Sequence, residues 1–161
     1  MCGKEVGGLE SADATLFKDA TFVLTPTLRT TDQALKLARE LVAAVGARAV
    51  VLEAEQHDRA VAVISHLPYL LASALVQSEA QASERDPITG ALASSGFRDT
   101  SRLAASQTEM MLDILLTNRQ GVEEALDIFE AQLRRARALL ADPEGLKEWM
   151  ERAQTRRREM F

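Results

Sequence analysis

The sequence predicts a mainly α-helical fold that follows a single β-α-β unit. Two strand-like runs, T-F-V-L-T at 21–25 and A-V-V-L at 49–52, flank one amphipathic segment. After residue 53, apolar residues recur at helical spacing and no strand signal returns. Two strands and one helix are too few to stand alone, so we expect the end of a larger α/β domain. The prediction is therefore an α/β remnant at 1–53 and an all-helical domain at 54–161.

Local signals define the β-α-β unit. Pro26 ends the first strand, Thr31 or Asp32 can cap the helix, and Gly46 can stop it. The second strand is apolar throughout, as in a sheet that is covered on both faces. A strand–helix–strand connection of this kind should be right-handed and parallel.

The helical part is expected to contain several segments. A helix covers roughly 54–81, a polar loop with the breaker Asp86-Pro87 follows, and a helix runs from Gly96 to about Thr117. Asp142 should cap a last helix, with Pro143 in its first turn. Between these lies an apolar seam with the a/d spacing of a coiled coil, formed by Val122, Leu126, Phe129, Leu133, Ala136 and Leu140.

Composition limits the partners and the compartment. A net charge of −5 and a pI near 5.1 argue against nucleic acid as a partner. Cys2 is the only cysteine, which fits a reducing compartment. The opening is polar and glycine-rich, unlike a signal peptide, and the apolar run Ala60–Val76 is too short for a comfortable membrane span. We therefore expect a cytoplasmic protein that does not enter a membrane.

The stretch H-D-R-A-V-A-V-I-S-H-L-P at 57–68 is the strongest candidate for a pocket wall. Pro68 removes a backbone hydrogen bond and clashes with the carbonyl of Ile64, so the helix should kink beside Ser65 and His66. On a straight helix His57 and His66 point to opposite sides, which makes a shared metal ion improbable, and no metal site is predicted. Each histidine could also be an ordinary core or capping residue.

Other polar and sulfur-containing residues admit two interpretations. Arg98, Asp99 and Arg102 could form an exposed ion-pair cluster, or Asp99 could hold a guanidinium fork that binds a carboxylate. Their spacing does not decide between these. The Met110-Met111 pair is expected to fill the core.

Three stretches together resemble the prephenate/arogenate dehydrogenase family of tyrosine biosynthesis. They are M-C-G-K-E-V-G-G at 1–8, H-D-x-x-x-A-x-x-S-H-L-P at 57–68 and G-F-R-D-T-S-R-L-A at 96–104. The first is similar to the family's H-P-(M/I)-A-G-x-E-x-x-G, whose histidine is catalytic. The resemblance spans essentially the whole chain, and the second and third stretches are quite specific.

The resemblance implies a fold and an activity. The helical part would be a dimerisation domain like the C-terminal domain of 6-phosphogluconate dehydrogenase, forming a homodimer and one wall of the active site. The β-α-β unit would be the last piece of a Rossmann domain that binds NAD or NADP. The reaction would be the oxidative decarboxylation of prephenate or arogenate, with tyrosine as a candidate inhibitor. Met1 would lie two residues past the catalytic histidine, so the chain alone would be inactive.

The resemblance also assigns roles to individual residues. Arg102 would bind a substrate carboxylate and Glu5 would lie at the pocket mouth. The central helix would approach the substrate and the nicotinamide through His57, Ser65, His66 and Tyr69. Gly3 and Lys4 would contact the cofactor.

Three positions depart from the family pattern. Lys4 replaces a small polar residue. Tyr69 replaces a histidine common in prephenate-preferring members, which leaves the substrate open. Met111 stands where the family often has an aromatic pocket wall.

Two other functions are compatible with the sequence. One is a non-catalytic helical homodimer that binds a ligand. The other is the C-terminal domain of a different NAD(P)-dependent hydroxy-acid dehydrogenase.

Overall fold

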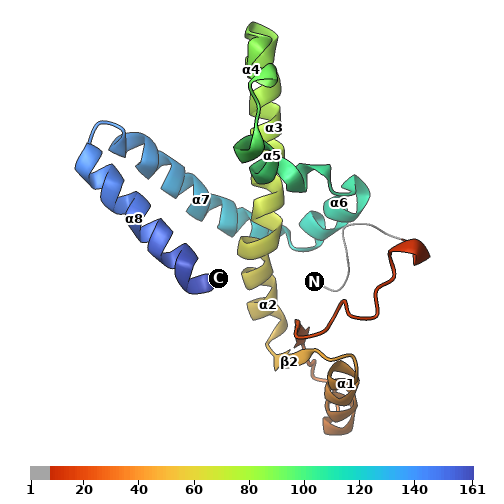
Figure 1. Ribbon diagram of the computed structural model, residues 1–161. Helices are drawn as coiled ribbons and strands as arrows, with labels where there is room; N and C mark the ends of the chain where they lie inside the picture. Colours follow the sequence, from red (N-terminus) through yellow and green to blue (C-terminus); the bar gives the residue numbers. More distant parts are fainter. Residues whose placement is uncertain (1–7) are drawn as a thin grey trace. The chain divides into compact units, whose positions relative to one another are not determined.

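The computed structural model describes residues 8–161, which fall into two compact units, 8–122 and 123–161. The elements are coloured along the chain in Figure 1. In the first unit a 3₁₀ turn at Leu9–Ser11 precedes β1 (Thr21–Leu24), α1 (Asp32–Ala44), β2 (Arg48–Val51), α2 (Ala54–Val61), a π turn (Ala62–His66), α3 (Leu67–Arg85), α4 (Ile88–Ala91), α5 (Ser95–Ser101), a 3₁₀ turn (Arg102–Ala105) and α6 (Thr108–Thr117). Helix α7 (Arg119–Leu139) leads into the second unit, which also holds α8 (Pro143–Met160).

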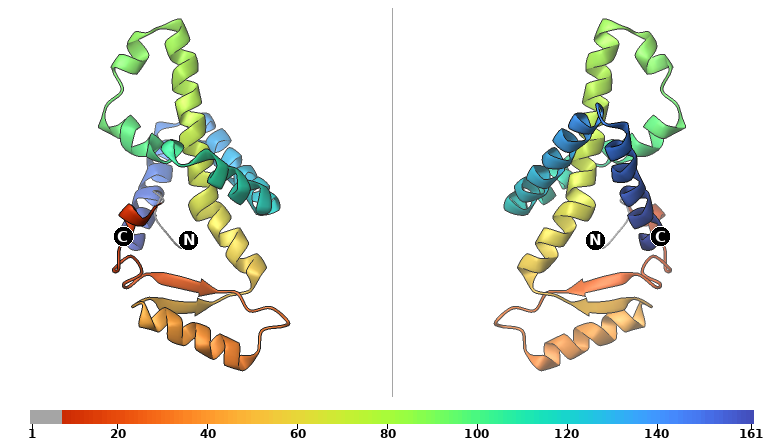
Figure 2. Two further views of the ribbon diagram at one scale, coloured as in Figure 1. Left: turned by 90° about the vertical axis from the view of Figure 1, so that its right-hand side faces the viewer. Right: turned by 90° about the vertical axis from the view of Figure 1, so that its left-hand side faces the viewer.

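The β-α-β unit is confirmed, with a parallel sheet. β1 pairs with β2 in the register Thr21 to Arg48 through Leu24 to Val51. The Thr31 hydroxyl caps α1 by accepting from the Ala34 N–H at 3.2 Å. α1 packs on β2 and lies along the sheet (Figure 2). Gly46 has a φ of +78°, a left-handed conformation that explains the glycine after α1.

The segment around Pro68 forms one long helix, Ala54–Arg85, interrupted by the π turn (Figure 1). The Leu67 N–H donates to the carbonyl of Ala62, five residues earlier. Proline has no N–H to continue the α-type ladder, and the wider turn absorbs that mismatch. The interruption therefore lies where we expected a kink, and its form is a π turn.

The central helix is longer than predicted. It continues to Arg85 instead of ending near Gln81, because the breaker is Asp86-Pro87 itself and not the polar residues before it. By length and composition this helix of 32 residues is also apolar enough to cross a membrane. A core helix passes the same test, but here only 22% of its most apolar window is buried within the chain. Most of its apolar surface is therefore available for another surface to cover.

The single helix expected over 96–117 is divided into α5, a 3₁₀ turn and α6, with an interruption at Ser106 and Gln107. Side-chain hydroxyls explain the break. Thr100 donates to the carbonyl of Gly96 at 2.8 Å, and Ser106 donates to that of Leu103 at 2.8 Å. Such bonds compete with the backbone ladder and favour helix ends. α4, α5 and the 3₁₀ turn all contact α3.

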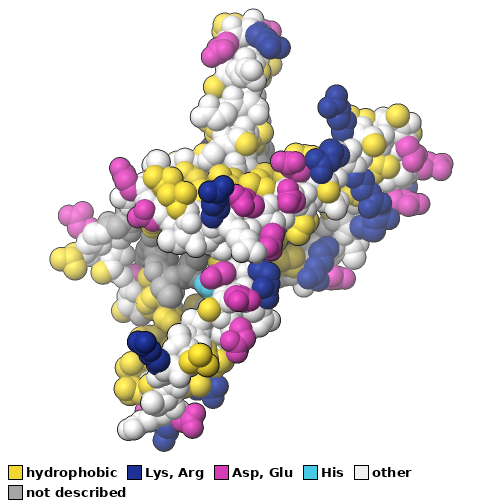
Figure 3. All heavy atoms as spheres, turned by 180° about the vertical axis from the view of Figure 1, so that it is seen from behind, with side chains coloured by type: hydrophobic (Ala, Val, Ile, Leu, Met, Phe, Trp, Pro, Cys, Tyr) yellow, Lys and Arg dark blue, Asp and Glu magenta, His cyan; other side chains and the backbone are white. Residues whose placement is uncertain are grey.

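The first unit has a small core. Its buried apolar residues are Val42, Ala62, Leu67, Ala72, Met111 and Val122, and the buried polar residue is His66. Many large apolar side chains are exposed, including Ile64 at 69% and Leu116 at 62% (Figure 3).

The second unit is a helical hairpin of α7 and α8. Asp142 caps α8 as predicted, because its carboxylate accepts from the Gly145 N–H at 3.1 Å. The Trp149 indole donates to the side chain of Gln132 at 3.3 Å and joins the two helices. The predicted seam is only partly covered, since Leu133 is 54% exposed and Leu140 is 72% exposed.

Candidate functional site

A pocket of about 330 Å³ opens beside the π turn in the first unit. It is formed by the end of α2, the π turn, the end of α6 and the residue that follows α6. Its lining combines two imidazoles, a carboxylate and an amide with apolar side chains, and consists of His57, Asp58, Val61, His66, Ile114, Thr117 and Asn118.

His57 is paired with its neighbour in sequence. Its Nδ1 lies 2.9 Å from a carboxylate oxygen of Asp58, and the two side chains are 31% and 54% exposed. A histidine at the surface beside acidic side chains is visible in Figure 3. Because a carboxylate only accepts, Nδ1 of His57 carries the proton. In neutral His57 the other nitrogen, Nε2, is therefore an acceptor.

His66 occupies the buried side of the same pocket and is only 5% exposed. Its Nδ1 lies 3.2 Å from the Nδ2 of Asn118. The same Nδ2 lies 2.7 Å from the carbonyl oxygen of Asp58. Burial lowers the pKa of His66 below 6.5, the Asp58 carboxylate opposes this shift, and His57 adds to it. At neutral pH His66 is therefore uncharged.

The pocket is polar but carries no permanent positive charge. The described residues that line it include neither lysine nor arginine, and His66 is neutral. These side chains can exchange hydrogen bonds with a hydroxyl or a carbonyl, and the apolar side chains can contact a ring. A carboxylate would need a cation from elsewhere.

The structure brings together only part of the predicted substrate-binding set. His57 and His66 line the pocket, whereas Ser65 and Tyr69 are half-buried on the same helix and are absent from the lining. Arg102 is exposed, at the start of the 3₁₀ turn, and is also absent from the lining. The predicted contacts Gly3, Lys4 and Glu5 lie outside the described residues.

The structure distinguishes between the interpretations of the Arg98-Asp99 and Met110-Met111 pairs. Arg98 pairs with Asp99 at 3.7 Å and both side chains are more than three-quarters exposed, so this pair is a surface ion pair. Met111 is 7% exposed in the core, as expected, while Met110 is 38% exposed. Met111 is not among the residues that line this pocket.

Asn118 is a pocket residue that the sequence analysis missed. It is the only asparagine in the chain, and it separates α6 from α7. Asparagine at a helix boundary was a usable signal, because its side chain bonds to backbone groups that the helix leaves open. Its partner His66, however, is 52 residues away in sequence, and no spacing rule connects the two.

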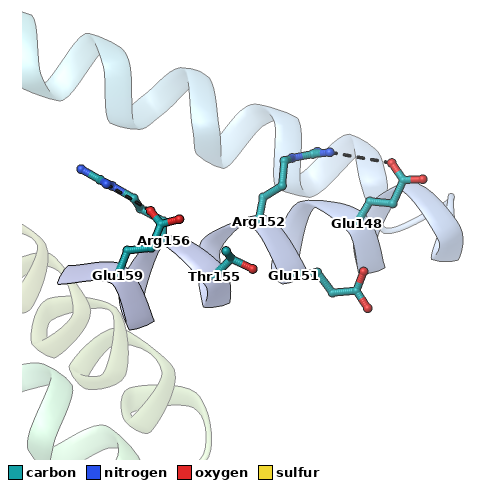
Figure 4. A pocket seen from close by; sticks show the side chains of 6 residues that line it. All are labelled: Glu148, Glu151, Arg152, Thr155, Arg156 and Glu159. Atoms are coloured by element: carbon teal, nitrogen blue, oxygen red, sulfur yellow. Dashed lines mark hydrogen bonds and ion pairs between the residues drawn. The ribbon is translucent and has the colours of Figure 1, made fainter. Parts of the chain in front are cut away.

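Another hollow lies along α8, and its lining residues all come from that one helix (Figure 4). Its charges already pair with one another: Arg152 contacts Glu148 at 3.7 Å, and Arg156 contacts Glu159 at 3.2 Å. These residues are exposed, so the hollow is a solvated helix face with no reactive group.

Residues 8–161 lack the side-chain groups that a metal ion or a complete dinucleotide site requires. Within that range no three His, Cys, Asp or Glu side chains lie close enough together to hold a metal ion. The sequence contains one β-α-β unit and no G-x-G-x-x-G turn, so these residues do not form a complete dinucleotide site.

Two family models match the chain in succession. Residues 1–51 match "Prephenate dehydrogenase, nucleotide-binding domain", and residues 53–152 match "Prephenate dehydrogenase, dimerization domain". The junction between the matches falls where β2 leads into α2.

Curated proteins and a solved structure agree with these matches. The chain is 34% identical over 127 residues to a prephenate dehydrogenase of Bacillus subtilis (strain 168), covering 79% of this chain and 34% of that one. It is 35% identical over 147 residues to a cyclohexadienyl dehydrogenase of Zymomonas mobilis, covering 90% and 50%. A crystal structure of prephenate dehydrogenase from A. aeolicus with hydroxyphenyl propionate and NAD+ has a TM-score of 0.88 and 30% identity, covering 99% and 56%. The chain thus spans half or less of the length of these two curated relatives.

Proposed function

The chain belongs to the prephenate dehydrogenase family, and from this we propose that it is the dimerisation and substrate-binding part of a prephenate or arogenate dehydrogenase. The complete protein would catalyse an oxidative decarboxylation in tyrosine biosynthesis, in the cytoplasm. NAD(P) use is a property of the family, because its model includes a nucleotide-binding domain and a neighbouring structure holds NAD+.

The observation that carries the proposal is the pocket built on the H-D-x-x-x-A-x-x-S-H-L-P stretch. This stretch supplies both imidazoles, and the π turn inside it places His66 in the pocket wall. Neutral His57 offers an acceptor at Nε2, since its Nδ1 is engaged by Asp58. A ring alcohol that loses its proton on oxidation fits an acceptor of this kind.

Carboxylate binding is assigned to Arg102. The substrates are anions, and the described lining has no fixed cation. The planar guanidinium of arginine matches a carboxylate in a two-pronged hydrogen bond. Ser65 and Tyr69 are proposed to act from the neighbouring surface of the central helix, and Glu5, Gly3 and Lys4 from the chain's opening segment.

The cofactor would be held largely outside this chain. The described residues supply one β-α-β unit and lack the glycine-rich turn that cradles a pyrophosphate. We therefore propose that the 161 residues alone form no NAD(P)H, and that this unit completes a nucleotide-binding domain.

We also propose that the protein is a homodimer. The family model over 53–152 describes a dimerization domain. The 54–85 helix buries only 22% of its most apolar window within the chain, and a second copy would cover the remainder.

Tyrosine, which carries the phenol ring of an aromatised product, is the proposed inhibitor.

A binding titration tests the substrate site. With the protein that carries this sequence, calorimetry should detect binding of hydroxyphenyl propionate and no binding of an unrelated 2-hydroxy acid. His66→Ala and Arg102→Ala should each weaken binding by about tenfold or more, since each removes a polar contact to the ligand, worth about 1.5 kcal/mol. The control Lys147→Ala changes an exposed charge on α8 and should bind like the wild type. Equal affinity in the His66 variant would contradict the assignment of this pocket.

A further inference from the structure

The side-chain amide of Asn118 bridges two groups that belong to the central helix. Its Nδ2 lies 2.7 Å from the carbonyl oxygen of Asp58 and 3.2 Å from the Nδ1 of His66. A carbonyl oxygen only accepts hydrogen bonds, so the amide must turn its nitrogen, and not its oxygen, towards Asp58. The nitrogen carries two hydrogens. One is donated to Asp58, and the second can be donated to Nδ1 of His66, which lies 3.2 Å away.

From this geometry we propose that Asn118 is a positioning residue that holds His66 in the neutral tautomer with its proton on Nε2. Nδ1 of His66 must accept, because the group that faces it is a donor. The remaining ring nitrogen, Nε2, then carries the hydrogen and makes His66 a donor. The two imidazoles of the pocket are thereby set in opposite senses, with His57 protonated on Nδ1 and His66 on Nε2.

Burial favours the uncharged form of His66 and outweighs the opposing effect of the nearby carboxylate. α2 presents Asp58, which favours a charged imidazole, and His57, which disfavours it. From α6 the lining residues are the uncharged Ile114 and Thr117. Protonation of Nδ1 would point an N–H at the amide N–H of Asn118, so charging His66 requires the amide to turn away.

Gly121 provides the space that this arrangement needs. A Cβ on Gly121 would lie 2.6 Å from Oδ1 of Asn118 and 3.4 Å from the Cβ of Ala62. The first distance is shorter than contacts at real Cβ atoms, so any larger residue would displace the amide. The Asn118 backbone is also anchored, since its N–H donates to Ile114 at 3.2 Å and its carbonyl accepts from Val122 at 3.0 Å.

Only the role of the two imidazoles toward a substrate rests on the proposed function. In a dehydrogenase acting on a cyclohexadienol acid, a donor fixed at Nε2 of His66 would hold a substrate oxygen and an acceptor on His57 would face a hydroxyl. The tautomer itself is a property of the free protein and is measured without substrate.

The test is nitrogen NMR of the full chain labelled with 15N-histidine. The sequence has two histidines, and His57→Gln assigns the remaining signals to His66. We expect His66 at neutral pH to show a protonated Nε2 and an unprotonated Nδ1. Asn118→Asp replaces the donor by an acceptor of the same shape, so Nδ1 should become protonated and the His66 ring should titrate at higher pH. Gly121→Ala, which displaces the amide, should yield a mixture of tautomers.

Gln107→Glu is the matched control, because it makes the same amide-to-carboxylate change at an exposed position before α6. It should leave the His66 signals as in the wild type. A protonated Nδ1 in the wild type, or an unchanged tautomer in Asn118→Asp, would overturn the inference, and the wild-type spectrum decides even if a variant fails to fold. The expected tautomer without binding of hydroxyphenyl propionate would instead count against the proposed function alone.

Discussion

At the scale of single residues, the pocket depends on how each imidazole is held. His57 and His66 could be singled out from the sequence because both lie in one motif on one helix. Their hydrogen-bond partners differ in how easily the sequence reveals them. Asp58 is adjacent to His57, whereas Asn118 lies 52 residues away from His66. Ser65 was predicted for the same site from the kink expected at Pro68 and from the family-like S-H-L-P stretch, yet it lies outside the described lining. Adjacency in sequence does not fix which side chains share a cavity.

Burial of His66 gives the folded protein a pH dependence. The pKa of His66 is below 6.5 in the folded chain, mainly through desolvation, so the unfolded chain binds a proton more readily. Well above pH 6.5, from about pH 7.5, the imidazole is neutral in both the folded and the unfolded chain, and its contribution to stability is constant. As the pH falls from that value towards the lowered pKa, the free energy of unfolding should fall, by at most about 1.4 kcal/mol per pH unit for one proton.

Urea unfolding between about pH 7 and about pH 5 measures this dependence. His66→Gln should have a shallower slope than the wild type, because it removes the titrating group. His57→Gln retains His66 and its burial, the largest cause of the lowered pKa, so it should keep most of the slope. Identical slopes in the wild type and His66→Gln would show that His66 is not the group responsible.

At the scale of elements, caps and breakers were the most predictable features. Thr31, Gly46 and Asp142 all end or begin helices where the sequence indicated, because capping depends on neighbours within a few residues. The form of the interruption at Pro68 was not predictable. Proline removes one backbone hydrogen bond, but this alone does not show that the preceding turn widens into a π turn. The sequence did not reveal that the helix expected over 96–117 is divided. The division depends on side-chain hydrogen bonds such as that from the Ser106 hydroxyl, and these depend on the side-chain rotamer.

The Asp142 cap provides a local stability test. Asp142→Ala should lower the free energy of unfolding by about 1 kcal/mol, because the Gly145 N–H loses its acceptor. Hydrogen exchange at the Gly145 amide should accelerate at the same time. Asp142→Ser keeps a capping oxygen and should remain close to the wild type. An alanine variant as stable and as protected as the serine variant would rule out a contribution from the cap.

At the scale of the whole molecule, the fold class and the family were accessible from sequence, whereas the surface that covers each apolar helix face was not. The three family-like stretches led to the same family that the matches at 1–51 and 53–152 show. The apolar seam on α7 predicted buried residues, yet Leu133 is 54% exposed in the single chain. Spacing shows that a helix face is apolar, but not which surface covers it.

Sedimentation tests the proposed dimer. For the 161-residue chain, the mass of the dimer should be twice 17.6 kDa, or about 35 kDa. Leu133→Lys should shift the equilibrium towards the monomer, because it places a charge in the apolar seam where a second copy would pack. Ala131→Lys adds the same charge at an exposed position of α7 and should stay dimeric. A monomeric wild type at micromolar concentration would contradict the dimer.

The most direct test of the account is turnover by the complete protein that carries these residues. NAD(P)H formation should be measured with prephenate, with arogenate and with a 2-hydroxy acid that lacks the cyclohexadiene ring. Prephenate or arogenate should yield NAD(P)H and carbon dioxide, and the 2-hydroxy acid should yield neither. Turnover of the 2-hydroxy acid alone would indicate a different dehydrogenase. No turnover of any of the three would contradict the proposed activity and favour a non-catalytic ligand-binding dimer.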